Sequence, residues 1–215
     1  MRVKICGVTN ADDARIAEEA GADYVGFVLT TGFARSLALT EAPHVAAATG
    51  LPRVAVVVDE SPEEAARRAD AIDAAVVQLH GNEDADHVAA LRRLGDWAVW
   101  KAVRARAPEE VRAAVAALAD LVDGFLVEGW REGVVGGGGV ALAVEPAAVR
   151  AAVPGSHDFV MAGGLTPEGV AAAVARFTPD VVDVSSGVER TVGHKDAARV
   201  HAFVRSVRDA APGTT

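Results

Sequence analysis

The sequence has very little cysteine: among its 215 residues only Cys6 carries a thiol, so no internal disulfide can form. A chain without disulfides is typical of a reducing compartment, and we expect this one to work in the cytoplasm. The N-terminal segment lacks the apolar core of a secretion signal, and no uninterrupted apolar run reaches the ~20 residues that a membrane span needs. The sequence therefore predicts neither export nor insertion into a membrane.

Basic residues are also in short supply, with 21 Lys and Arg against 30 Asp and Glu and a formal net charge of −9. This balance argues against a surface for nucleic acid or anionic lipid. It leaves room for an anionic small substrate, because backbone N–H groups can hold phosphate. Neither a His-Glu-x-x-His spacing nor a cluster of metal-ligating residues is visible, so we expect no metal and no other cofactor.

Apolar residues are plentiful, at 51% of the chain, and they fall into short runs that alternate with Ala-rich amphipathic stretches. Near-continuous apolar runs of this kind are typical of parallel strands covered by helices. The expected strands are Arg2–Val8, Asp23–Leu29, Arg53–Val58, Ala75–Leu79, Ala98–Val103, Gly124–Val127, Asp158–Ala162 and Val181–Ser185.

Helix start signals follow most of these strands. Asn10 and Ser61 are suited to cap helices, and Thr166-Pro167-Glu168 repeats the Ser-Pro-Glu pattern found at 61–63. A last helix is expected from near Asp196 to about Asp209, followed by a frayed tail from about 210. The glycine-rich stretch 129–140 is long for a connection and predicts a functional loop.

Eight strand–helix units predict an α/β fold, a single (β/α)8 TIM barrel that forms one domain over residues 1–215. The alternative is a doubly wound open sheet. Such sheets usually carry a Gly-rich dinucleotide fingerprint after the first strand, and none is present. No linker divides the chain.

In a barrel of this kind the chemistry lies at the C-terminal ends of the strands. By position alone, Cys6 fits a small core residue better than a catalyst, and His80 and Lys101 could each be structural. Gly163-Gly164 and Ser185-Ser186-Gly187 are different, because they follow adjacent strands seven and eight, where barrels commonly hold phosphate. These two turns predict a phosphate site.

Several segments together resemble one enzyme family. They are Lys4–Thr9, Gly21–Val28, Val77–Gly81, Ala162–Glu168, Val182–Glu189 and Gly193–Asp196. In this order they resemble the phosphoribosylanthranilate isomerase family of tryptophan biosynthesis, which has the (β/α)8 fold. The matches extend from residue 3 to residue 196, and Lys-Ile-Cys-Gly with Asp-Val-Ser-Ser-Gly-Val-Glu is a specific combination.

The resemblance implies an Amadori rearrangement, in which an N-phosphoribosyl arylamine becomes a 1-amino-1-deoxyribulose 5-phosphate. It assigns Cys6 as the base and Arg35 as the group that holds the anthranilate carboxylate. It also implies a phosphorylated small-molecule substrate and a monomer or homodimer. The substrate-binding residues that it implies are Arg35, His80, Gly163, Gly164, Asp183, Ser185, Ser186 and Gly187.

A thiol acts as a base only as thiolate, so Cys6 needs a lowered pKa. Lys4 lies on the same strand face as Cys6 by period-two alternation. It either favours the thiolate or serves as the partner of a structural ion pair.

The chain departs from the family at positions that touch substrate. Glu128 stands where the family has its acid, an Asp at the end of strand six, and we expect Glu128 to be the acid here. The loop after it keeps its glycines but loses a Lys and an Asp, and Ala34 replaces a Ser. Alternatively, Glu128 pairs with Arg131 and does no chemistry.

These departures leave three functions open. The first is phosphoribosylanthranilate isomerase itself. The second is a relative that performs the same rearrangement on a different N-glycoside in specialised metabolism. The third is a barrel that only binds a sugar phosphate, against which the retention of Cys6, Arg35 and a carboxyl at Glu128 argues.

Overall fold

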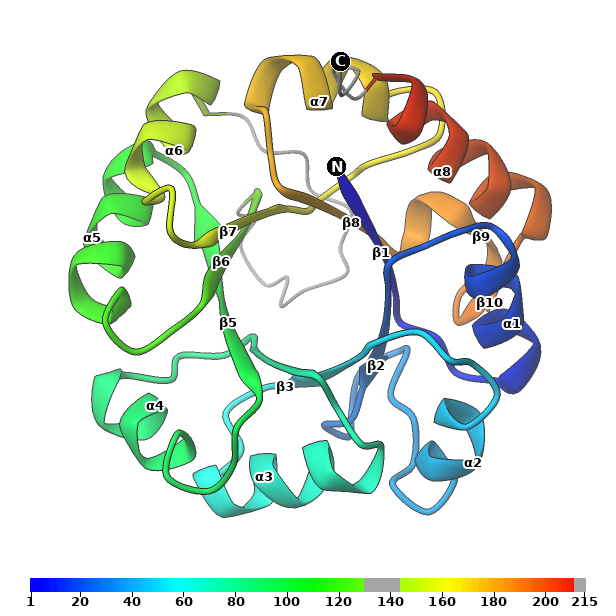
Figure 1. Cartoon of the computed structure of the whole chain (residues 1–215), viewed down its shortest axis with the longest axis horizontal. Coiled ribbons are helices and arrows are strands. Elements are labelled where there is room, and N and C mark those ends of the chain that lie inside the picture. The colour runs from blue at the N-terminus through cyan, green and yellow to red at the C-terminus, as the bar shows by residue number, and fades with distance from the viewer. Residues whose placement is uncertain (130–143, 211–215) are drawn as a thin grey trace.

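Eight parallel strands close into a barrel in chain order in the computed structural model, which describes residues 1–129 and 144–210 (Figure 1). Strand β8 pairs with β1, with Lys4 opposite Asp183, and this pairing closes the ring. The predicted (β/α)8 barrel is thus confirmed. The strands are β1 Arg2–Cys6, β2 Tyr24–Val28, β3 Arg53–Val57, β4 Val76–Leu79, β5 Ala98–Ala105, β6 Gly124–Gly129, β7 Asp158–Met161 and β8 Val181–Val184.

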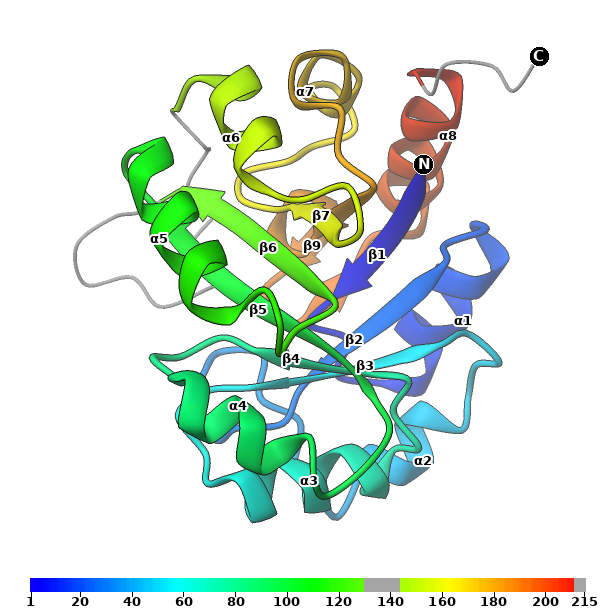
Figure 2. The same ribbon diagram turned by 60° about the vertical axis from the view of Figure 1, so that its left-hand side comes forward.

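The helices form a ring outside the barrel, and the strands lie side by side within that ring (Figures 1 and 2). Asn10 and Ser61 cap the first and third helices as expected, each accepting a hydrogen bond from a backbone N–H three residues later. The helices are α1 Ala11–Glu19, α2 Ala42–Ala46, α3 Pro62–Ala71, α4 Ala85–Leu91, α5 Pro108–Leu118, α6 Pro146–Ala152, α7 Val170–Phe177 and α8 Ala197–Ala210.

The expected helix start at Thr166 is wrong, because α7 begins at Val170. Gly169 donates its N–H to the carbonyl of Thr166 at 3.1 Å and to its Oγ1 at 3.2 Å. Thr166 therefore closes a turn that precedes the helix. The sequence also gave no sign of the 3-10 turn η1 (Ser186–Val188) or of the hairpin β9 (Glu189–Thr191) and β10 (His194–Lys195) that follow β8.

Two layers of buried apolar side chains stabilise the barrel. One lies between the strands and the helices, and the other fills the barrel interior from alternate strand positions. Trp100 is the largest buried side chain of the inner layer and meets the ring of Tyr24 edge-on at 5.3 Å. Gly124 makes room for it, since a Cβ there would lie 2.8 Å from Trp100 Cδ1. The inner layer consists of Cys6, Val54, Val56, Val76, Trp100, Ala102, Leu126, Val160, Ala162 and Val181.

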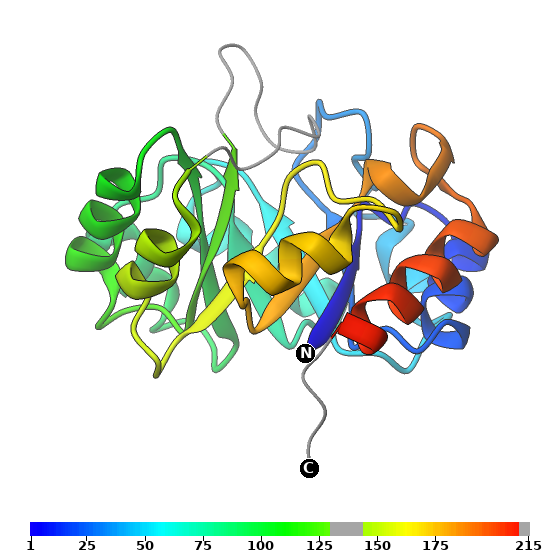
Figure 3. The ribbon, with the colours of Figure 1, turned by 90° about the horizontal axis from the view of Figure 1, so that it is seen from above.

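The two ends of the barrel differ. Figure 3 shows the N-terminus, where β1 begins, at the lower face, so the strands direct their C-terminal ends to the upper face. The upper face is where the candidate site residues were expected. Of the predicted functional loop 129–140, only Gly129 is among the described residues, and the predicted frayed tail lies outside them after Ala210.

Candidate active site

Strand alternation brings five candidate residues to the mouth of the barrel. Leu126 and Val181 belong to the inner apolar layer, and Glu128 and Asp183 follow each of them by two residues on the same strand face. Cys6 is itself a member of that layer. His80 follows the inward-facing Gln78 of β4 by two residues, and Ser185 follows Asp183 of β8 by two, so both also face the barrel interior. The barrel thus collects a thiol, two carboxyls, an imidazole and a hydroxyl from four strands.

Cys6 lies above a buried ion pair. Lys4 is fully buried, and its Nζ contacts Asp183 Oδ1 at 2.9 Å. Gly26 on the adjacent strand leaves space for both inward side chains of β1, because a Cβ there would lie 3.0 Å from Cys6 Sγ and 3.1 Å from Lys4 Nζ. The structure contains both roles considered for Lys4: it forms the ion pair with Asp183, and its charge favours the Cys6 thiolate.

The barrel raises the pKa of the Cys6 thiol above its ordinary value. Burial is the largest cause and the charge of Asp183 adds to it, while Lys4 and Lys195 act in the opposite direction. Burial alone would lower the pKa of Lys4, but Asp183 and Cys6 outweigh it and the pKa is raised, so Lys4 stays cationic. The lowered thiol pKa that a base requires is therefore not supplied by Lys4.

Arg35 is held against the mouth by a carboxylate. Its Nε and Nη2 donate to Glu189 Oε1 and Oε2 at 2.8 and 2.7 Å. Glu189 also contacts the buried Lys195 at 2.9 Å, and Lys195 donates to the carbonyl of Cys6 at 2.6 Å. Burial acts to raise the pKa of Glu189, but its hydrogen bonds with Arg35 and Lys195 lower it below the ordinary value. This network fixes Arg35 beside the end of β1, where its Cδ would meet a Cβ at Gly7.

Glu128 is joined to β4 through an imidazole. His80 Nε2 lies 3.1 Å from Glu128 Oε1, and His80 Nδ1 lies 2.9 Å from the amide nitrogen of Gln78. All three side chains are buried, with exposed fractions of 8% for His80, 8% for Glu128 and 1% for Gln78. Glu128 and His80 therefore form one unit across the mouth, 48 residues apart in the chain.

The two turns expected to hold phosphate are in contact. Gly163 and Gly164 have φ angles of +93° and +65°, a region that favours glycine. A Cβ at Gly187 would lie 1.8 Å from the carbonyl oxygen of Leu165, so the loop after β8 packs directly on the loop after β7. Ser185 and Ser186 lead into η1 at this contact.

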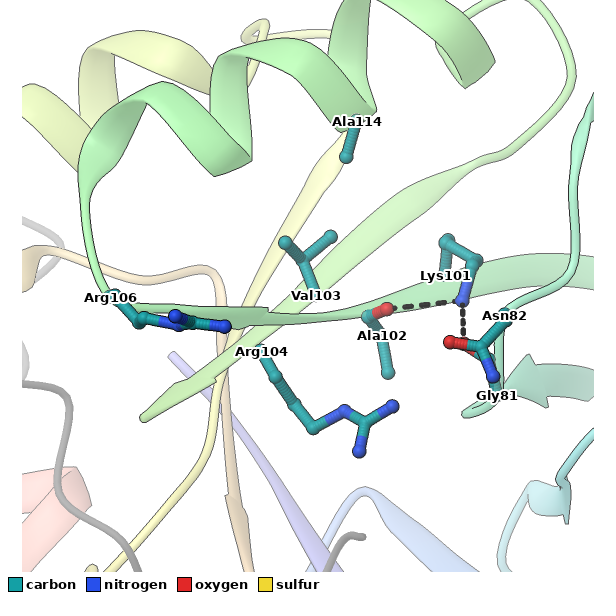
Figure 4. Close-up of a pocket in the computed structure, with 8 residues that line it drawn as sticks. All are labelled: Gly81, Asn82, Lys101, Ala102, Val103, Arg104, Arg106 and Ala114. Atoms are coloured by element: carbon teal, nitrogen blue, oxygen red, sulfur yellow. Dashed lines mark hydrogen bonds between the residues drawn. The ribbon is translucent and has the colours of Figure 1, made fainter. Parts of the chain in front are cut away.

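Lys101 has a structural role. Its Nζ contacts Glu83 at 3.0 Å and donates to the carbonyl of Gly81 at 2.8 Å, which ties β5 to the loop after β4. A pocket of about 340 Å³ lies at this junction. In Figure 4, Arg104 and Ala102 project from one face of β5, and Val103 projects from the other toward α5.

Sequence reasoning missed Gln78, Glu189 and Lys195 as functional candidates. Gln78 could have been found, because a buried amide two residues before His80 shares its strand face. Glu189 and Lys195 stand in segments that resemble the family, but the pairing of Glu189 with Arg35 joins residues far apart in the chain. No pattern in the sequence indicates that pairing.

Two classes of feature are absent from the part of the chain that the structure describes. None of its helices combines the length and apolarity that crossing a bilayer requires. Residues 1–129 and 144–210 also contain no group of three or more His, Cys, Asp or Glu side chains that could hold a metal ion.

Comparison with known proteins agrees with this geometry. A family model described as "N-(5'phosphoribosyl)anthranilate (PRA) isomerase" matches residues 3–206. An N-(5'-phosphoribosyl)anthranilate isomerase of Rubrobacter xylanophilus is 37% identical over 214 residues, which cover 96% of this chain and 98% of that one.

Two solved structures extend the comparison. Monomers generated from the dimeric phosphoribosylanthranilate isomerase of Thermotoga maritima superpose with a TM-score of 0.83 at 30% identity, covering 97% of this chain and 99% of that one. A phosphoribosylanthranilate isomerase in complex with reduced 1-(o-carboxyphenylamino)-1-deoxyribulose 5-phosphate gives a TM-score of 0.82 at 29% identity, with the same coverage.

The ionisation of Cys6 can be tested directly, because selective 13C labelling of cysteine gives one NMR signal. We expect its titration midpoint to lie above the ~8.5 of a free thiol. Lys4→Met should raise the midpoint further, since it removes a cation that favours thiolate and leaves Asp183 unpaired.

Lys101→Met is the matched control for that titration. It also breaks a buried Lys–carboxylate pair, but this pair is on the outer face of β5, so the Cys6 midpoint should not move. A wild-type midpoint below that of a free thiol would contradict the assigned effect of burial.

Proposed function

The chain belongs to the N-(5'-phosphoribosyl)anthranilate isomerase family, and we propose that Cys6 and Glu128 carry out the proton transfers of its reaction. The chain is an isomerase of the aldose–ketose type in tryptophan biosynthesis, and it rearranges N-(5-phosphoribosyl)anthranilate to a 1-amino-1-deoxyribulose 5-phosphate. The observation that carries the proposal is that a thiol and a carboxyl, both buried, face inward at the mouth from β1 and β6.

Glu128 acts first, as the acid. Its carboxyl gives a proton to the ribose ring oxygen while the bond from that oxygen to C1 breaks. The lone pair of the anthranilate nitrogen forms the C1=N bond of a cationic Schiff base. Placing the acid and the base on different strands gives them separate environments, as the two opposite tasks require.

Cys6 acts second, as the base. The thiolate takes the proton from C2, the C–H electron pair forms the C1=C2 bond, and the C=N electrons return to nitrogen. The enolamine becomes the ketone when a proton adds to C1 and the C2 hydroxyl loses one. A cation next to the sulfur favours thiolate, so the Schiff base itself offsets the effect of burial on the thiol pKa.

The remaining residues hold the substrate. Backbone N–H groups and hydroxyls at Gly163, Gly164, Ser185, Ser186 and Gly187 surround the phosphate, supported by the contact between their two loops. Arg35, kept in place by Glu189, faces the anthranilate carboxylate, and Asp183 and His80 complete the wall around the ribose.

We infer further that the chain works in the cytoplasm, as a monomer or homodimer and as a single domain. A single cysteine supports the location, and the dimeric relative in Thermotoga maritima supports the homodimer. The acidic net charge argues against nucleic acid or an anionic membrane as the partner, and the relative solved with a reduced deoxyribulose 5-phosphate supports a small phosphorylated molecule. The residues assigned to the two proton transfers need neither metal nor cofactor.

Replacing the base should stop the reaction without unfolding the barrel. Cys6→Ala removes only a sulfur, and we expect turnover to fall by ~100-fold or more, the usual effect of losing a positioned acid or base. Turnover of freshly made phosphoribosylanthranilate and the thermal midpoint of unfolding are the two measurements. Near-normal activity would mean that another group removes the C2 proton.

The phosphate site predicts that Gly164→Asp weakens substrate binding far more than stability. The new carboxylate would repel the phosphate, and the measurement is KM together with the unfolding midpoint. Gly21→Asp is the matched control, because Gly21 also has a positive φ, of +80°, and has open space at its Cβ position. Equal KM values for the two variants would place the phosphate elsewhere.

The acid is tested by two substitutions at one position. Glu128→Gln keeps the shape of the side chain but has no transferable proton, so we expect it to abolish turnover. Glu128→Asp keeps the proton but moves it by about one C–C bond, ~1.5 Å, so part of the activity should remain. Full activity in Glu128→Gln would show that the acid is a different residue.

A further inference from the structure

A buried chain of two hydrogen bonds connects β4 to Glu128. The amide nitrogen of Gln78 donates to His80 Nδ1 at 2.9 Å, and His80 Nε2 lies 3.1 Å from Glu128 Oε1. Gln78 lies in β4, two residues before His80, so both side chains point into the barrel. Within the described residues both ring nitrogens of His80 are thus occupied by other protein groups.

The first of these bonds determines the second. An amide N–H can only donate, so His80 Nδ1 must accept, and a neutral imidazole then carries its hydrogen on Nε2. In that tautomer the Nε2–H donates to Glu128 Oε1. Second partners commonly fix the tautomer of a histidine in this way.

We propose that His80, held in its Nε2–H tautomer by Gln78, is a positioning residue for the acid. The inference rests on the proposed role of Glu128. A carboxyl group whose Oε1 accepts a hydrogen bond carries its own proton on Oε2, so His80 selects which oxygen delivers the proton. When Oε2–H gives its proton to the ribose ring oxygen, the carboxylate that remains keeps the bond from His80 as a stronger, charge-assisted one.

The length of the Glu128 side chain allows its carboxyl to reach His80 on β4. Strand β5 lies between β4 and β6, and two strand spacings are about 9–10 Å. An Asp at position 128 would withdraw its carboxyl by ~1.5 Å from an imidazole now at 3.1 Å, beyond hydrogen-bonding range. The Glu that replaces the family's Asp therefore gains a partner that Asp cannot reach.

Two substitutions of His80 separate positioning from other roles. His80→Gln places an amide N–H where the ring Nε2–H was, so it should keep most of kcat. His80→Leu has no donor, and we expect kcat to fall by ~10–100-fold with little change in KM, because a carboxyl misplaced by about 1 Å is enough for such a loss. A rise in KM with kcat unchanged would show that His80 serves only as part of the wall around the ribose, and unchanged kcat and KM in His80→Leu would show that it has no role; either overturns the proposal.

The same substitution in a Glu128→Asp background completes a double-mutant cycle. Because Asp at 128 has already lost the contact, His80→Leu should cause almost no further loss there. An equal loss in both backgrounds would mean that His80 does not act through Glu128. His157→Leu is the matched control: it removes a half-buried histidine that also has two hydrogen-bond partners, at the opposite end of the barrel, and should leave kcat unchanged.

The tautomer is measured without any activity assay. 15N NMR of the wild-type chain should show His80 with its hydrogen on Nε2, with the signal assigned by its loss in His80→Gln. Gln78→Met, which cannot donate, should release that preference. A wild-type Nδ1–H tautomer would overturn the proposal, whereas activity in Glu128→Gln would instead overturn the assignment of the acid.

Discussion

Closure of eight parallel strands forces every second residue of each strand into the barrel, and the rest of the structure depends on what those residues are. The lower interior is filled by Trp100 and aliphatic side chains. One level higher, Lys4 and Asp183 form a buried ion pair, and Gly26 leaves the space that it needs. The side chains that are proposed to react lie directly above this ion pair, which therefore forms the bottom of the site. Removing one member of such a pair usually costs about 3–5 kcal/mol, whereas exposed pairs contribute far less.

Much of this arrangement could be predicted from local patterns. All eight strands were placed to within two residues, because apolar runs between capped helices are a local signal. Cys6 and Ser185 were expected at the mouth because they stand at the C-terminal ends of the first and last predicted strands, and the structure has them at the ends of β1 and β8. The start of α7 was wrong because Thr-Pro-Glu begins a turn as readily as a helix. The pairs Arg35–Glu189 and His80–Glu128 could not be predicted, since they depend on barrel closure between residues 154 and 48 positions apart.

The thiol shows where a sequence argument about charge fails. A lysine two residues from Cys6 suggested a favoured thiolate, but the same burial that brings Lys4 close also desolvates the sulfur, and the charge of Asp183 acts on the thiol pKa against that of Lys4. A thiol with a raised pKa becomes a better base when a cation arrives beside it. In the mechanism proposed above that cation is the Schiff base, so the electrostatics of the interior favour proton transfer to Cys6 after the ring has opened.

The acid and the base are therefore controlled by different physical means. Charge controls Cys6, through Lys4, Asp183 and the substrate's own intermediate. Hydrogen bonding holds Glu128, the proposed acid, through an imidazole whose other ring nitrogen lies beside an amide. A neutral donor suits an acid better than a fixed cation, because a cation would stabilise the ionised carboxylate. It also explains how a longer side chain can replace Asp at this position: the additional methylene is compensated by a partner on β4 that fixes the direction of the carboxyl.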